Sequence, residues 1–243
     1  GDRLHHQLAV AVRHGGGEDA VPDPLIGQRI LAEGEGGQLL DVAGPLQVFA
    51  SCNSLLGRSG RAEAYRTRVL ARHGGVVATS SGLALVATAL PAPDPAPDTL
   101  IVGVWNGGEQ RYAEYFPQKV LAAAPTTVRH EYVSKAQNGR AQADAFLRFV
   151  VEELKPAIDR RFSTRAGPRD TFIVGSSMGG LIALYALCEY PQVFGGAAAL
   201  SAHWVGIPTA WGEARLRNAA LPLAMLNYLA AQLPGPGRHR VWV

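Results

Sequence analysis

The chain has 243 residues, 47% of them hydrophobic, and a formal net charge of +3. This length fits one α/β domain with a substantial core. The positive charge comes mainly from arginines that are interleaved with acids and form no dense run, so we expect no nucleic-acid partner. Two uncharged windows, 171–188 and 190–212, are long enough to span a bilayer, but glycine and serine interrupt them. We interpret both as buried core and expect no membrane partner.

The two cysteines, Cys52 and Cys188, form neither a metal-ligand pattern nor a disulfide framework. Each lies in an apolar, helix-like stretch, which favours buried thiols in a reducing, cytoplasmic compartment. We expect no metal and no cofactor.

Short strands dominate the first half of the chain after a loose lead-in over residues 1–27. Gly44 and Pro45 open a predicted helix whose apolar residues recur at about helical spacing. A stiff, extended connector, PAPDPAPD, occupies residues 91–98, and the apolar run after it is typical of a strand buried on both faces. The expected strands up to that point span residues 8–12, 30–32, 65–71, 76–79, 83–89 and 99–104.

Residues 143–158 predict one amphipathic helix. Glu152, Glu153 and Lys155 take the polar face, and Pro156 either kinks the helix or starts a new turn. The apolar stripe consists of Phe146, Phe149, Val150, Leu154 and Ile158.

A strand over 171–174, a helix over 178–190 and a strand over 196–200 succeed one another. This order predicts a right-handed parallel crossover. The predicted fold class is therefore α/β: a three-layer sandwich with a mostly parallel central sheet.

The pentapeptide Gly175-Ser176-Ser177-Met178-Gly179 fits G-x-S-x-G and lies between the predicted strand and helix. A Cβ two positions before or after the serine would collide with neighbouring backbone in so tight a turn. The turn would lift the Ser177 hydroxyl above the strand ends as a nucleophile, and the Met178 N–H would point toward a developing oxyanion. The alternative is a strand-to-helix turn without chemistry.

Four segments of the second half carry a resemblance to a known family. They resemble the Putative esterase family that includes enterochelin-esterase-like hydrolases, over about residues 103–243. The resemblance implies an α/β-hydrolase fold, with Ser177 as the nucleophile in the hydrolysis of carboxylic esters. The segments are NGGEQRYAEYFP (106–117), FLRFVVEELKPAID (146–159), TFIVGSSMGGLIALYA (171–186) and YPQVFGGAAALSAHW (190–204).

The same resemblance implies that Trp105, Asn106 and Arg111 bind substrate. It also implies that Arg111 and Glu114, in the segment after the strand 99–104, line the site or brace that loop. The alternative for both residues is a salt-bridged loop without a role in the site.

The first half, about 28–102, is similar to the amidotransferase-like sensor domain of AraC-type regulators. Three segments carry this similarity: ILAEGEGGQLLDVAGPLQVF (30–49), YRTRVLARHGGVVATSSG (65–82) and DTLIV (98–102). The two resemblances meet inside one strand, around residues 101–104, so the chain reads as a natural or engineered hybrid. We expect residues 1–243 to form a single domain with one sheet that unfolds as a unit.

The acid and the histidine that should assist Ser177 are the least certain part of the predicted site. In α/β-hydrolases the acid and the histidine come after the nucleophile, and the only histidines after Ser177 are His203 and His239. His203 comes after the strand 196–200 and is expected at the same sheet edge as Ser177, either as a substitute base or in a structural or substrate-contacting role. His239 would lie at the opposite edge, in the segment RHRVWV (238–243) that resembles the start of the strand before the family's acid, so the chain is predicted to be C-terminally truncated.

The only acids after Ser177 are Glu189 and Glu213. Glu189 is expected away from the site, at the end of the helix, and Glu213 is an open candidate for the acid partner. An unassisted serine is a weak nucleophile, although oxyanion and binding effects alone leave about 10³–10⁴-fold acceleration.

Three hypotheses remain. The first is a weak or promiscuous serine hydrolase that acts on small-molecule carboxylic esters, with lactones as further candidates, through an acyl-enzyme on Ser177. The second is a non-catalytic small-molecule-binding module in which Asp41 and the loop 34–37 matter. The third is a purely structural hybrid. A homo-oligomer remains an open alternative in each case.

Overall fold

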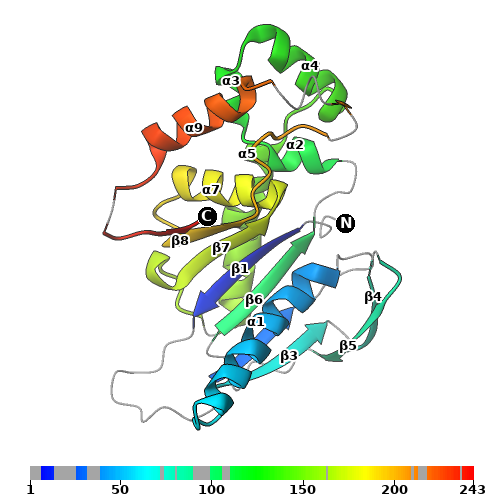
Figure 1. The fold of residues 1–243 in the computed structure, drawn as a ribbon, viewed down its shortest axis with the longest axis vertical. Helices are drawn as coiled ribbons and strands as arrows, with labels where there is room; N and C mark the ends of the chain where they lie inside the picture. The colour runs from blue at the N-terminus through cyan, green and yellow to red at the C-terminus, as the bar shows by residue number, and fades with distance from the viewer. Residues whose placement is uncertain are drawn as a thin grey trace. The chain divides into compact units, whose positions relative to one another are not determined.

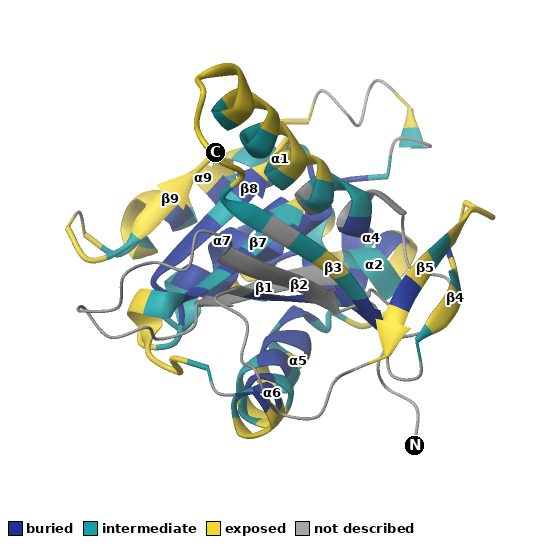
Figure 2. Cartoon of the chain, turned by 90° about the horizontal axis from the view of Figure 1, so that it is seen from below, coloured by how far each residue is buried: buried dark blue, intermediate teal, exposed yellow. Residues whose placement is uncertain are grey.

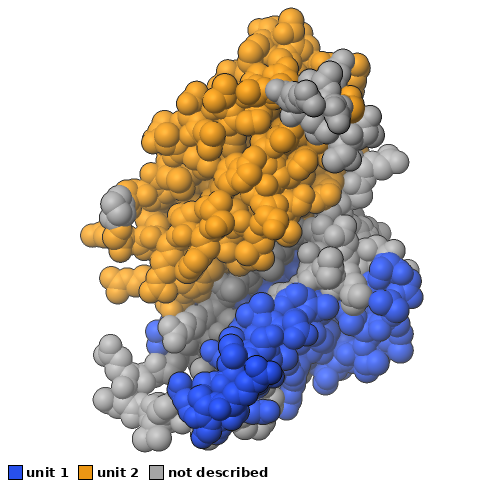
Figure 3. Space-filling view, in the orientation of Figure 1, with its two compact units in different colours: residues 1–105, 158–166 blue, residues 106–157, 167–243 orange. Residues whose placement is uncertain are grey.

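The computed structural model describes residues 7–13, 26–31, 39–71, 74–79, 81–89, 99–105, 110–162, 164–208, 211–212, 218–235 and 237–243. The chain divides into two compact units (Figure 3). Unit 1 comprises residues 1–105 and 158–166, and unit 2 comprises residues 106–157 and 167–243.

Unit 1 is built on a sheet whose strands have the order β4-β5-β3-β2-β6-β1. β2 pairs parallel with β3 and β6, and β3 pairs parallel with β5, whereas β1 runs antiparallel to β6 and β4 antiparallel to β5. The strands are β1 (Gln7–Arg13), β2 (Ile26–Leu31), β3 (Tyr65–Ala71), β4 (Gly75–Ala78), β5 (Ala84–Ala89) and β6 (Thr99–Trp105). Each expected strand of this half is therefore present, but β2 begins four residues before the predicted start at residue 30, inside the expected lead-in over residues 1–27.

The helix of unit 1, α1 (Leu39–Arg58), begins five residues before the predicted start at Gly44. Val42 is only 2% exposed and packs with Leu46 and Phe49, and the i, i+4, i+7 spacing of these residues extends the apolar stripe toward the N-terminus. The prediction from Gly44 and Pro45 was wrong because this stripe, rather than the Gly-Pro pair, sets where the helix begins.

Unit 2 contains a parallel sheet with the order β7-β8-β9, in which α7 connects β7 to β8 and packs on both strands (Figure 1). The strands are β7 (Thr171–Ser176), β8 (Gly196–Leu200) and β9 (Arg240–Trp242). Every residue of α7 (Met178–Glu189) from Met178 to Leu187 is buried, and Figure 2 shows this helix mainly in dark blue. A helix that is apolar on all sides needs such enclosure.

The remaining helices lie before β7 and after β8, in unit 2 except for residues 158–161, which belong to unit 1. Two of them, α4 and α9, flank the loop that comes after β8. The set comprises α2 (Arg111–Tyr115), α3 (Gln118–Ala123), α4 (Thr126–Ala136), α5 (Ala143–Arg148), η2 (Phe149–Leu154), α6 (Lys155–Arg161), the short 3-10 turn η3 (Pro168–Asp170) and α9 (Ala220–Gln232).

The predicted helix over 143–158 is one helical run with a π-helical segment, η2, in its middle. There the Lys155 N–H reaches the carbonyl of Val150, five residues back, immediately before Pro156. This wider turn adds about one residue per turn relative to an α-helix and shifts the phase of the next turns. Lys155, predicted on the polar face, is consequently only 8% exposed, while Glu152 remains exposed as expected.

The α/β class is confirmed. The single three-layer sandwich with one central sheet stays a prediction. Within the described ranges, no helix has both the length and the apolarity needed to cross a bilayer.

Candidate active site

Ser177 stands at the junction of β7 and α7 in a strained backbone conformation. Its φ of 57° and ψ of −120° lie in a region that non-glycine residues adopt at a cost of about 1–3 kcal/mol. Three backbone hydrogen bonds hold it there. Its N–H donates to Leu200 O at 3.0 Å, and its carbonyl accepts from Gly180 N at 3.0 Å and from His203 N at 3.1 Å. This strand, strained serine and helix have the geometry of a nucleophile elbow.

The glycines of the elbow confirm one steric expectation and correct the other. A Cβ on Gly175 would lie 2.0 Å from Gly179 O, so only glycine fits two positions before the serine. A Cβ on Gly179 would meet nothing within 4 Å, so the expected collision two positions after the serine was wrong. The close approach falls on Gly180 instead, where a Cβ would lie 3.1 Å from Ala202 Cβ. This second close approach involves Ala202, in the chain after β8, so the pentapeptide alone could not predict it.

Met178 occupies the first position of α7, with a side chain only 1% exposed. The first N–H groups of a helix have no partner within the helix and carry partial positive charge. Among the described residues, the Met178 N–H has no hydrogen-bond acceptor. An unpaired donor next to Ser177 suits an oxyanion, and that role stays a prediction.

His203 lies three residues after β8, and its backbone N–H binds the Ser177 carbonyl, so the two residues share one edge of the sheet as expected. Its ring is half-buried, and Nε2 lies 2.8 Å from Ile207 O. Because a carbonyl only accepts, Nε2 carries the hydrogen and Nδ1 is the free acceptor of the neutral ring. No hydrogen bond within the described part of the chain joins this ring to Ser177, and the base role stays a prediction.

His239 lies at the opposite end of the sheet. β9 pairs parallel with β8 in the register Gly196↔Arg240, and His239 Nε2 lies 2.9 Å from Pro191 O, before β8 begins. Ser177 is bonded to Leu200, the last residue of β8. Four strand residues, or about 13 Å, separate the two levels, which confirms that His239 is remote from the serine.

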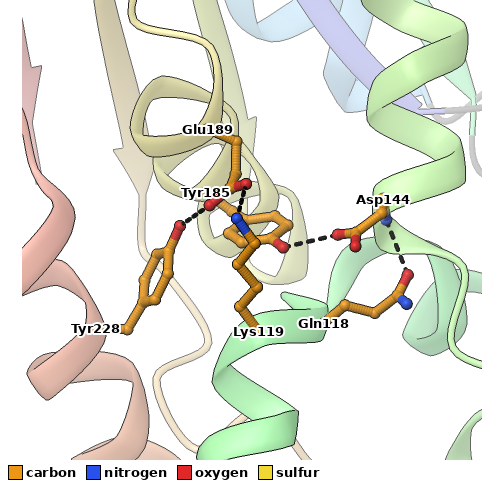
Figure 4. Close-up of polar contacts among 6 residues, drawn as sticks. All are labelled: Gln118, Lys119, Asp144, Tyr185, Glu189 and Tyr228. Carbon is orange, nitrogen blue, oxygen red and sulfur yellow. Dashed lines mark hydrogen bonds and ion pairs between the residues drawn. The ribbon is translucent and has the colours of Figure 1, made fainter.

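Glu189 ends α7, about 18 Å along the helix from its start, and is engaged in its own network (Figure 4). It pairs with Lys119, and the Tyr228 hydroxyl donates to it at 2.5 Å. One turn earlier, the Tyr185 hydroxyl donates to Asp144 at 2.6 Å. Burial raises the pKa of Tyr228, and its hydrogen bond to Glu189 raises it further, so this phenol remains a donor. The expectation that Glu189 lies away from the site is confirmed, and the cluster clamps the far end of the elbow helix.

A brace that the sequence did not reveal holds the loop after His203. The Tyr132 hydroxyl on α4 donates to Gly206 O at 2.5 Å, and the Gly206 N–H donates to His203 O at 2.7 Å. Gly206 has a φ of 70°, and a Cβ there would lie 2.3 Å from the ring of Phe116. Glycine is therefore required, and the loop carrying His203 is fixed against two aromatic rings.

Replacing Tyr132 by phenylalanine should lower the free energy of unfolding by about 1–3 kcal/mol, because the buried Gly206 carbonyl would lose its donor. Urea unfolding curves measure the effect. Tyr190→Phe is the matched control, since the Tyr190 hydroxyl has no hydrogen bond among the described residues, and it should change stability little. Equal effects of the two substitutions would contradict the brace.

The predicted substrate-binding residues are only partly described. Arg111 begins α2 and is half-buried; its Nε is buried and has no hydrogen-bond partner within the described ranges. Glu114, on the same helix, is 7% exposed. Trp105 ends β6 in unit 1, and Asp41 lies in α1. The side chains of both residues are outside the described part of the structure. Asn106, Glu213 and the loop 34–37 also lie outside the described residues.

Both cysteines are free and half-buried. Burial, with a smaller contribution from Glu189, raises the pKa of Cys188 to about 12, so its thiol stays protonated near neutral pH and does not compete as a nucleophile. Among the described residues, no three histidine, cysteine or acidic side chains gather as metal ligands would.

Comparison with known proteins establishes the family. Residues 88–232, more than half of the 243-residue chain, match the family model described as Putative esterase, and the chain belongs to that family. The family resemblance expected from the sequence is thereby confirmed, and the match begins about fifteen residues earlier than the boundary at 103. No curated protein matches the chain.

Several solved structures are similar at low identity. Enterochelin esterase from Shigella flexneri is 18% identical with a TM-score of 0.40, over 96% of this chain and 40% of that one. An IroE-like serine hydrolase from Shewanella oneidensis is 17% identical with a TM-score of 0.34, over 86% and 49% of the two chains. FphF, a fluorophosphonate-binding serine hydrolase from Staphylococcus aureus, is 13% identical with a TM-score of 0.37, over 94% and 70%. This chain thus spans less than half the length of the first two proteins.

Proposed function

We propose that the chain is a serine hydrolase that cleaves small-molecule carboxylic esters, with Ser177 as the nucleophile in an α/β-hydrolase elbow. The observation that carries this proposal is the strained conformation of Ser177, held by three backbone hydrogen bonds and permitted by Gly175. Such strain persists only where surrounding structure enforces it, and it gathers at functional sites. Membership of the Putative esterase family supports the same reaction.

In the proposed reaction the Ser177 Oγ bonds to the ester carbonyl carbon while its proton passes to a base. The carbonyl oxygen becomes negative and accepts a hydrogen bond from the Met178 N–H, which is free of other partners in the described part. The alcohol leaves with the proton, and water then releases the acid from the acyl-enzyme. Lactones, which are cyclic esters, would open by the same steps.

We propose that turnover is slow and tolerant of different esters. Glu189 is already bound to Lys119 and Tyr228, and His203 is oriented by a carbonyl instead of a carboxylate. A neutral carbonyl stabilises an imidazolium less than a carboxylate does, so the serine is poorly activated. Arg111, whose buried Nε has no partner among the described residues, would bind a substrate oxygen, with Trp105 and Asn106 as further proposed contacts.

Covalent labelling with a fluorophosphonate tests this proposal, because such a probe reacts with activated serines. We expect mass spectrometry of a digest to place the label on Ser177, and Ser177→Ala to lose both the label and the slow hydrolysis of short acyl esters. Ser176→Ala is the matched control, since Ser176 is the exposed neighbour at the end of β7, and it should keep the label. A label on another residue, or unchanged hydrolysis in Ser177→Ala, would contradict the catalytic role of Ser177 and favour a non-catalytic binding module.

We further propose that the chain is a hybrid whose first part, from residue 28, is related to AraC-type sensor domains. Its esterase part begins at residue 88, where the family match starts, and not at the predicted 103. The two halves are proposed to share one domain, because splitting the strand around 101–104 would expose apolar edges. Calorimetry should then give one thermal transition, and two well-separated transitions would contradict the single domain.

The free thiols of Cys52 and Cys188 support a reducing, cytoplasmic location.

A further inference from the structure

A pocket of about 40 Å³ opens in unit 2 between α4, the start of α9 and the chain that comes after His203. The described lining includes neither Ser177 nor His203, so the pocket is a candidate site of its own rather than part of the nucleophile elbow. Two of the lining side chains are polar, Glu131 and Asn218. The others form the apolar walls: Val128, Tyr132, Ile207, Trp211 and Leu221.

The apolar walls are held in place by one hydrogen bond and by aromatic packing. The Tyr132 hydroxyl donates to Gly206 O at 2.5 Å. The Tyr132 ring lies 4.7 Å from that of Phe116 and 6.1 Å from that of Trp211, centroid to centroid. Tyr132 is only 1% exposed and Ile207 only 5%. Walls fixed in this way keep the cavity open when it is empty, and preformed apolar cavities with a few polar groups are the usual sites of small molecules.

Glu131 is the one charged side chain in the described lining. It lies on α4 directly before Tyr132, with its side chain 32% exposed, and its Oε1 accepts a hydrogen bond from Lys135 Nζ at 3.0 Å. The Lys135 side chain is 58% exposed. A solvent-exposed pair of this kind contributes little free energy, so another cation can take the place of Lys135 at small cost.

The size of the pocket and the chemistry of its lining define the occupant. One water needs about 10–15 Å³ measured in this way, so the pocket takes about three or four heavy atoms. The walls favour hydrocarbon, and each methylene that leaves water for them improves binding about fourfold. The Glu131 carboxylate favours a positively charged donor and opposes an anion, and the Asn218 carboxamide offers a further acceptor oxygen. A short alkyl chain with an ammonium head meets both demands.

We propose that this pocket binds short aliphatic ammonium ions, with the alkyl chain against the apolar walls and the ammonium on Glu131. In the empty pocket the Lys135 ammonium holds that position, so Lys135 and the ligand compete for one carboxylate. The inference does not depend on ester hydrolysis at Ser177, and Ser177→Ala should bind the same ions equally well.

Titration of the full chain with propylammonium tests the proposal, with the Trp211 indole N–H signal in NMR spectra as the reporter. Trp211→Phe assigns that signal among the four tryptophans. We expect a saturable shift, and binding about tenfold tighter than that of propan-1-ol, a neutral molecule of the same size, because hydrogen bonds to charged groups are the stronger ones. Propanoate at the same ionic strength should give no saturable shift. No saturable shift with propylammonium, or equal affinity for propan-1-ol, would overturn the inference.

Two substitutions on α4 test the sign of the charge. Glu131→Gln, which keeps the shape of the side chain and removes its charge, should weaken propylammonium binding about tenfold and leave propan-1-ol binding unchanged. Lys135→Gln should tighten propylammonium binding about twofold or more, since it removes the competitor. Glu153→Gln is the matched control, because Glu153 is an exposed glutamate outside the described lining, and it should change neither affinity. Propylammonium binding that survives Glu131→Gln, or weakens in Lys135→Gln, would refute the ammonium site.

Discussion

Replacing Gly175 by alanine should lower the free energy of unfolding by about 3 kcal/mol and abolish fluorophosphonate labelling of Ser177. The new Cβ would lie 2.0 Å from the oxygen, 2.2 Å from the carbonyl carbon and 2.8 Å from the Cα of Gly179. All three are backbone atoms, so no side chain can rotate away, and β7 and α7 must separate instead. Overpacking of a rigid site costs at the upper end of about 1–3 kcal/mol. Urea unfolding and labelling measure the two effects on the same sample.

Gly179→Ala provides the control within the same pentapeptide. A Cβ there meets nothing within 4 Å, and Gly179 lies in the first turn of α7. Alanine is favoured over glycine in a helix by up to about 1 kcal/mol, so this variant should be as stable as the parent or slightly more stable. A Gly175→Ala protein that unfolds and labels like the Gly179→Ala protein would refute the steric role assigned to the elbow.

Much of the fold could be predicted because it depends on local pattern. The strands 65–71 and 196–200 have the predicted bounds, and α7 ends one residue before its predicted end. The strand 65–71 alternates between polar and apolar residues, whereas the strand 196–200 and the helix α7 are apolar runs. The helix over 143–158 departs from its pattern at the π-helical segment before Pro156, since a stripe drawn at a fixed 3.6-residue period cannot anticipate a wider turn.

In the candidate site, too, the locally encoded part could be predicted and the long-range contacts could not. Ser177 and Gly175 could be recognised because the elbow is encoded in five consecutive residues between a strand and a helix. Its supports come from far along the chain: Tyr132 reaches Gly206 across 74 residues, and Lys119 reaches Glu189 across 70. No periodicity or motif connects such pairs, so only the folded structure reveals that His203 is held by a carbonyl and a braced loop.

Replacing His203 by alanine should reduce ester hydrolysis by about 100-fold or more, as far as Ser177→Ala does, because a general base contributes about 10²–10⁴-fold. The His203 backbone is bonded to Ser177, and the bond from Nε2 to Ile207 O leaves Nδ1 as the acceptor for the serine proton. Initial rates with p-nitrophenyl acetate measure the effect.

His239→Ala is the control for that substitution. Its ring also approaches a backbone carbonyl, that of Pro191, but at the opposite end of β8, so its loss should leave the rate unchanged. The pair therefore compares two histidines in similar hydrogen bonds that differ in their place on the sheet. If His203→Ala keeps most of the activity, the proton of Ser177 goes to water or to another side chain, and His203 serves only to hold the loop over the elbow.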